Sequence, residues 1–127
     1  MSLEKVFFGF FVLFAATLNF GFFLGDIGDP SVHSSIELYA AIVVGLVATV
    51  LKLGDRTQIG AIHLATSLVA MIQLIAAAVV YTIAQATMDP VPRNMVAVTV
   101  SLSGGALLAN IVSVILLVIE TSSFRRR

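Results

Sequence analysis

Hydrophobic residues are concentrated in four long stretches of the chain, and short connectors rich in charged residues, glycine and proline separate them. Within these stretches the few polar residues recur at helical spacing. Each stretch is close to or longer than the ~20 residues that a helix needs to cross a bilayer. The pattern therefore predicts an all-α polytopic membrane protein with one domain, residues 1–127, and four transmembrane helices at about 6–24, 34–53, 57–86 and 94–120.

Two of the predicted helices carry small and polar residues along one side and mostly aliphatic residues elsewhere. In helix 94–120 this side contains Thr99, Ser103, Ala106, Asn110, Ser113 and Glu120. In helix 57–86 it contains His63, Thr66, Ser67, Ala70, Gln73, Ala77, Tyr81 and Gln85. An amide such as that of Gln73 is costly to leave unpaired in hydrocarbon. We therefore expect each polar side to meet another helix or water.

Smaller features mark the first two predicted helices. Asn19 lies on a narrow side of the first helix, where it either hydrogen-bonds another helix or faces a polar path. Ala41, Gly45 and Ala48 share one side of the second helix. Because the spacing of Ala41 and Gly45 lets helix backbones approach closely, we predict that this side is a helix-packing surface.

Composition identifies the lipid bilayer as the surroundings of these helices. The chain is 59% hydrophobic and 11% charged, with a mean hydropathy of +1.07, whereas soluble domains are about half apolar and a quarter charged. The formal net charge is zero, which gives no indication of a nucleic-acid partner. The absence of cysteine excludes disulfides and thiolate metal sites. The first stretch is long for a signal peptide and lacks a small-residue cleavage site, so we interpret it as a helix of the mature protein.

The distribution of basic residues predicts the orientation. Of the seven lysine and arginine residues, only Arg93 lies in a connector on one side of the predicted membrane. The other six lie on the opposite side, at Lys5, Lys52, Arg56, Arg125, Arg126 and Arg127. Because basic residues are retained on the cytoplasmic side, we predict a multi-pass protein of the bacterial inner (plasma) membrane with both termini in the cytoplasm.

The connector after the first helix contains Asp26 and Asp29. If several copies assembled around an axis, these aspartates would form an acidic ring at a pore mouth and attract cations. The alternative is turn chemistry, in which Asp29 caps a helix that begins at Pro30. His33 is spaced too loosely from the two aspartates to indicate a ligand set, so we predict neither a metal site nor a cofactor.

The chemistry of an enzyme is missing from the sequence. It contains no glycine-rich phosphate loop and no His-Glu-x-x-His pattern, and its connectors are too short for a substrate domain. No carboxylate lies at the centre of a predicted span, which argues against proton-coupled antiport. His63 has two interpretations, as a hydrogen-bonded packing residue or as a pH-sensing or proton-relaying group.

Three segments carry a resemblance to a known family: TLNFGFF at 17–23, LKLGDRTQIG at 51–60 and SLSGGALLANIVS at 101–113. Together they resemble an uncharacterised family of small four-helix bacterial inner-membrane proteins. The resemblance implies a four-helix membrane fold but no activity and no binding residues. Fluoride channels and small multidrug exporters have a similar size, but the Thr/Phe-rich segment of the former does not follow Gly104 and Gly105, and the first predicted helix lacks the membrane glutamate of the latter.

These patterns predict a homo-oligomeric, passive cation channel with a neutral polar lining and an acidic outer vestibule formed by Asp26 and Asp29. The lining residues would be Asn19, Gln73, Ser103 and Asn110. The alternative is a non-conducting accessory or scaffold subunit whose polar sides pack against a larger transporter. Polar side chains that are satisfied within one copy would count against a path between copies.

Overall fold

The computed structural model describes residues 3–24, 35–54 and 57–125, and the regular structure in these ranges is entirely α-helical. Helix α1 spans Leu3–Phe23, α2 Ser35–Lys52, α3 Gln58–Thr87 and α4 Arg93–Arg125. Each helix is long and apolar enough to cross a membrane. The prediction of an all-α protein with four helices of membrane-spanning length is therefore confirmed.

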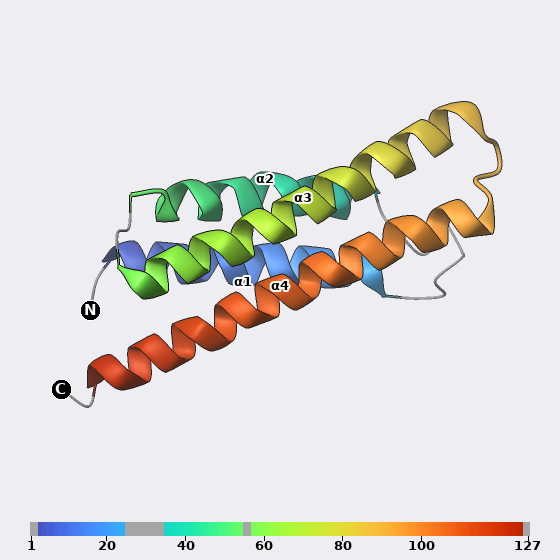
Figure 1. Cartoon of the computed structure of the whole chain (residues 1–127). Coiled ribbons are helices and arrows are strands. Elements are labelled where there is room, and N and C mark those ends of the chain that lie inside the picture. Colours follow the sequence, from blue (N-terminus) through green and yellow to red (C-terminus); the bar gives the residue numbers. More distant parts are fainter. Residues whose placement is uncertain (1–2, 25–34, 55–56, 126–127) are drawn as a thin grey trace.

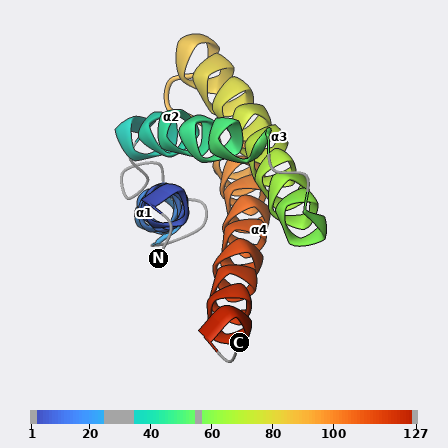
Figure 2. The same cartoon turned by 90° about the vertical axis from the view of Figure 1, so that its left-hand side faces the viewer.

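The helices form an antiparallel bundle in which both chain termini lie at the same end (Figure 1). Helices that follow one another in the chain pack together, and α4 also packs against α1, so the bundle closes into a ring. At the other end α3 and α4 extend beyond the two shorter helices (Figure 1). Figure 2 shows α1 end-on, beside the crossing of α2 and the long α3–α4 pair. We name the two ends the terminal end and the far end.

A side-chain cap fixes the start of α3. The Thr57 Oγ1 accepts a hydrogen bond from the backbone N–H of Gly60 at 3.0 Å. Such a cap satisfies one of the N–H groups that the first turn of a helix leaves without a helical partner. The cap at Thr57, six residues before His63, therefore defines where α3 begins.

The described residues form two apolar clusters inside the bundle. The larger one, toward the far end, consists of Phe22, Leu38, Ala41, Ala70, Leu74, Ala77, Tyr81, Val96, Val100 and Ala106. The smaller one, toward the terminal end, consists of Phe8, Val12 and Ala48. Aliphatic side chains also cover much of the outside, including Ile36, Val43, Ile72, Val79, Leu108, Ile115 and Val118. An apolar exterior of this kind fits a lipid environment.

The small residues of α2 lie on the side of the helix that packs inside the bundle. Ala41 and Ala48 are buried. At Gly45 an added Cβ would come within 2.8 Å of the Met71 Sδ of α3. The glycine therefore allows α2 and α3 to approach each other, as small residues do between membrane helices.

Candidate functional site

A reciprocal hydrogen-bonded pair joins α1 to α4 inside the bundle. The Asn19 Nδ2 donates to the Ser103 carbonyl oxygen at 3.0 Å, and the Ser103 hydroxyl donates to the Asn19 Oδ1. Both residues are completely buried. The pair satisfies polar groups within a single chain and fixes the register between the two helices.

Gln73 of α3 lies against the backbone of α4. A Cβ added at Gly105 would come within 2.7 Å of the Gln73 Nε2, so this glycine makes room for the amide. The Gln73 Oε1 is buried and has no hydrogen-bond partner among the described residues. The whole amide group therefore packs against Gly105, and among the described residues its carbonyl oxygen has no hydrogen-bond donor.

Asn110 of α4 lies beside a small internal cavity. The residue is 7% exposed, and its Nδ2 has no hydrogen-bond partner within the described part of the chain. The cavity is lined by residues from all four helices, and the space open to the centre of a water molecule is about 10 Å³. This volume is on the order of that needed for one water and leaves no room for a hydrated metal ion.

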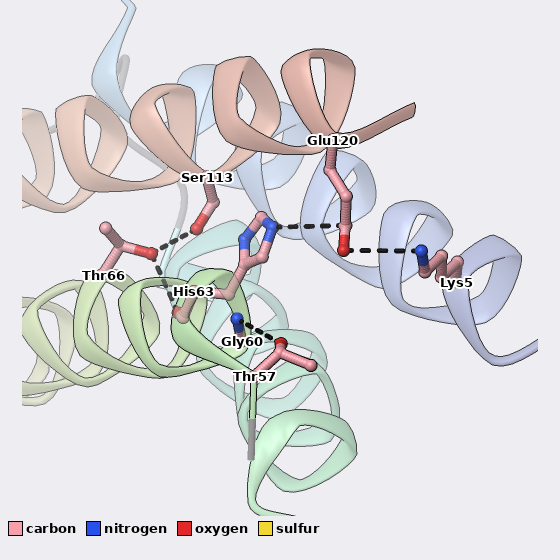
Figure 3. Close-up of polar contacts among 7 residues, drawn as sticks. All are labelled: Lys5, Thr57, Gly60, His63, Thr66, Ser113 and Glu120. Carbon is pink, nitrogen blue, oxygen red and sulfur yellow. Dashed lines mark hydrogen bonds and ion pairs between the residues drawn. The ribbon is translucent and has the colours of Figure 1, made fainter. Parts of the chain in front are cut away.

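An ionisable cluster occupies the terminal end, between α1, α3 and α4 (Figure 3). The Glu120 Oε2 lies 3.4 Å from the Lys5 Nζ, and the Glu120 Oε1 lies 4.0 Å from the His63 Nε2. The His63 side chain is completely buried, that of Glu120 is 14% exposed and that of Lys5 is 40% exposed. The carboxylate therefore lies between a buried imidazole and an ammonium group that reaches the surface.

Two hydroxyl groups extend from this cluster into the bundle (Figure 3). The Thr66 Oγ1 donates to the His63 carbonyl oxygen at 2.9 Å, and the Thr66 and Ser113 hydroxyls hydrogen-bond to each other. A hydroxyl has one proton to donate, so we assign Ser113 as the donor in the second bond. This contact links α3 to α4 one turn deeper than the histidine.

Helix α2 contributes a buried lysine to the same end. The Lys52 Nζ lies 4.4 Å from the centroid of the Phe8 ring, and Lys52 is only 2% exposed. Phe8 meets His63 edge-on, with ring centroids 5.0 Å apart. The face of an aromatic ring stabilises an ammonium group. All four helices therefore contribute to what we name the terminal cluster: Lys5, Phe8, Lys52, His63 and Glu120.

The polar side chains follow one another along the inside of α4. From Ser103 onward its inward polar residues are Ser103, Asn110, Ser113 and Glu120. They are separated by intervals of seven, three and seven residues, which correspond to roughly 10, 5 and 10 Å along the helix. Side chains of α3 occupy both wide intervals, since Gln73 lies over Gly105 and His63 lies beside Glu120. We name this set the inner polar row: Asn19, Ser103, Gln73, Asn110, Ser113, Thr66, His63 and Glu120.

These groups donate and accept hydrogen bonds, and the imidazole and carboxylate can also exchange protons. Among the described residues, no three His, Cys, Asp or Glu side chains are grouped in a way that could hold a metal ion. Hydroxyl and amide groups of this kind can order water, and an imidazole beside a carboxylate can transfer protons.

The structure places the predicted lining residues inside one chain. Asn19, Ser103 and Asn110 are buried, and Gln73 is partly buried. The prediction of a path between copies depends on polar side chains that find no hydrogen-bond partner within one chain. Asn19 and Ser103 do find partners within one chain, so they no longer support that path. Conduction itself stays a prediction, as does the acidic vestibule, because Asp26 and Asp29 lie outside the described residues.

The terminal cluster was not predicted from the sequence. Lys5 and Lys52 served only to orient the helices, and His63 and Glu120 were assigned to the polar sides of two different helices. One signal was present: in a bundle of consecutive antiparallel helices, α3 begins and α4 ends at the same end, which places His63 and Glu120 near each other along the bundle axis. Which sides of the two helices meet is decided only by the packing of the bundle.

The comparisons with known proteins assign no activity. A family model described as a family of unknown function, DUF6394, matches residues 32–121, which covers α2 and α3 and most of α4. The resemblance to an uncharacterised family is therefore confirmed. No curated protein and no solved structure matches the chain.

Proposed function

We propose that this chain, which belongs to the DUF6394 family of unknown function, is a multi-pass protein of the bacterial inner membrane with both termini in the cytoplasm. Four apolar helices and the common end of the two termini support this proposal (Figure 1). In the sequence, six of the seven lysine and arginine residues lie near the start of α1, near the connector between α2 and α3, or at the end of α4, and such a bias is typical of the cytoplasmic side. Fusion of a reporter enzyme that is active only in the cytoplasm tests it, since an inactive reporter at either terminus would contradict the orientation.

We propose further that the protein passively conducts a cation through the interior of each chain, and that this cation is the proton. The inner polar row is the observation that carries the proposal. A proton moves by exchange between hydrogen-bonded groups and needs no opening wider than a water molecule, whereas Na⁺ or K⁺ needs coordinating oxygens in place of its hydration shell. The cavity beside Asn110 suits only the first case.

The row does not reach the far end. Beyond Asn19 and Ser103 lies a layer that contains Phe22, Tyr81, Val96 and Val100, all of them buried. Phe22 and Tyr81 pack edge-on, with ring centroids 5.8 Å apart. We name this layer the far-end seal. Conduction therefore requires water to enter the seal, and the resulting flux is slow.

The far-end seal also favours a second candidate, the non-conducting accessory or scaffold subunit. A sealed bundle with an aliphatic exterior has the surface that membrane helices use to pack against other helices. In this case the inner polar row only fixes the register of the four helices, and a larger transporter supplies the activity.

One flux assay separates the two candidates. The purified protein is reconstituted into vesicles that contain a pH-sensitive dye, a K⁺ gradient with valinomycin sets the membrane potential, and proton entry is recorded. If the proposal holds, the protein raises proton entry above that of protein-free vesicles, and Asn110→Leu lowers it because the row is interrupted.

Thr17→Ala is the matched control. Thr17 is a polar residue on the exposed side of α1, and its hydroxyl donates a hydrogen bond to the Phe14 carbonyl oxygen of the same helix. The proton flux of this variant is expected to equal that of the unmodified protein. A flux equal to that of protein-free vesicles overturns conduction and leaves the accessory subunit.

The acidic vestibule and the homo-oligomer remain parts of the proposal with tests of their own. If conduction is found, Asp26→Asn together with Asp29→Asn is expected to reduce the preference for cations, and unchanged selectivity removes the vestibule. The mass of the protein in detergent decides its copy number. A path inside each chain does not require a second copy.

A further inference from the structure

We propose that the cavity inside the bundle is a binding site for a single water molecule, held between Asn110 of α4 and Ser67 of α3. The site does not depend on conduction. A bundle that only packs against other proteins would hold the same water.

Small side chains create the space. Residues from all four helices line the cavity, and four of them are alanine or glycine: Ala15, Gly45, Ala48 and Ala70. Val12, Met71 and Leu74 form apolar walls around the same space. The volume open to the centre of a water molecule is about 10 Å³, on the order of the minimum that one water requires.

The two polar residues of the lining decide whether this space is wet. An apolar cavity of this size stays empty, whereas a water that finds two or more polar partners is stably bound. Asn110 is 7% exposed and its Nδ2 has no hydrogen-bond partner among the described residues, and Ser67 is 6% exposed. A water between them accepts from the Asn110 amide and donates to the Ser67 hydroxyl, which removes the cost of an unsatisfied buried donor.

Gln73 also has an unsatisfied buried atom, its Oε1, but it does not line the cavity. We therefore assign the water to Asn110 and Ser67 alone. The water stands within the inner polar row, at the level where all four helices surround it.

The three asparagines of the chain provide the test and its controls. Asn94 is exposed, Asn19 is buried and donates to the Ser103 carbonyl oxygen, and Asn110 is buried beside the cavity. The full-length protein is labelled with ¹⁵N in its asparagine side chains and placed in detergent micelles, and dipolar cross-peaks between each NH₂ group and water are recorded. Substitution of each asparagine in turn assigns its signal.

We expect a cross-peak at Asn110 with the sign of a long-lived bound water, no cross-peak at Asn19 and only bulk exchange at Asn94. An Asn110 signal without a water cross-peak, like that of Asn19, means that the cavity is dry and overturns the site. Bulk exchange at Asn110, like that of Asn94, means that the site is open rather than a bound-water site and also overturns it.

A substitution that adds no polar group provides a second test. In Gly45→Ala the new methyl group enters the cavity lining and pushes against the Met71 Sδ, which lies 2.8 Å from the position of the Cβ. We expect loss of the Asn110 water cross-peak, while an unshifted Asn19 signal reports that the bundle remains folded. Gly9→Ala is the matched control, because its Cβ meets the Leu117 Cδ2 at 2.9 Å and lies outside the cavity lining. A cross-peak that persists in Gly45→Ala contradicts the site.

Discussion

The two ends of the bundle bury different chemistry. At the terminal end, the interior contains a carboxylate, an imidazole, a lysine and a pair of hydroxyls. At the far end, the interior consists mainly of the aromatic and aliphatic residues of the far-end seal. The buried Thr99 hydroxyl of this end stays within its own helix, where it donates to the Met95 carbonyl oxygen at 2.9 Å.

Under the proposed function, this difference assigns proton exchange with the surroundings to the terminal half and the barrier to passage to the far half. Lys5 extends the terminal cluster to the surface, so groups at this end lie within reach of water or lipid headgroups. The far-end seal separates Asn19 and Ser103 from the other face. Any role in transport therefore depends on the far end, whereas the terminal end and the inner polar row supply the groups that would take part.

The largest expected effect concerns packing at the far end. We expect Leu38→Ala to lower the free energy of unfolding by about 2 kcal/mol. This value is at the lower limit for a buried leucine in a soluble protein, because a leucine that leaves the bundle enters lipid rather than water. Leu46→Ala is the control on the same helix, since Leu38 is completely buried and Leu46 is 47% exposed. Circular dichroism during titration with a denaturing detergent measures both, and equal losses would contradict a packed far end.

The next effect concerns the far-end seal as a barrier. If the protein conducts protons, we expect Val100→Ser to raise the flux about tenfold, which corresponds to a barrier lowered by about 1.4 kcal/mol. Val98→Ser introduces the same hydroxyl on the exposed side of α4 and is expected to leave the flux unchanged. A flux that does not respond to Val100→Ser would place the barrier elsewhere.

A smaller effect concerns the polar pair at the boundary between the two halves. We expect Asn19→Leu to cost about 1 kcal/mol, because a hydrogen bond between membrane helices is lost and the Ser103 hydroxyl turns to its own helix. The double variant Asn19→Leu/Ser103→Ala is expected to lose less free energy of unfolding than the two single variants lose together. Strict additivity in the denaturation midpoints would show that the two side chains do not interact.

The smallest effect concerns the ion pair of the terminal cluster. We expect Glu120→Gln to lower the free energy of unfolding by less than about 1 kcal/mol, because the Lys5 side chain is partly exposed. The loss is expected to shrink at high ionic strength, where salt screens the pair. In a double-mutant cycle with Lys5→Met, a coupling energy that does not change with salt would contradict an exposed pair.

Much of the fold follows from the order of residues alone. Long apolar stretches at helical period can satisfy their backbone groups in lipid only as helices, which is why four helices of membrane-spanning length were predicted correctly. The positions of Asn110 and Ser103 on one side of α4 were likewise readable from their spacing, because that spacing determines the side of a helix on which a residue lies.

What faces that side was decided only by the tertiary structure. Spacing describes a single helix, so the sequence did not tell whether the polar sides of α3 and α4 would meet each other or a second chain. The packing of the four helices paired Asn19 with Ser103, brought Lys5 and His63 to Glu120, and left Asn110 beside a cavity. These contacts join residues far apart in the chain, and only the rotation and register of the packed helices determine them.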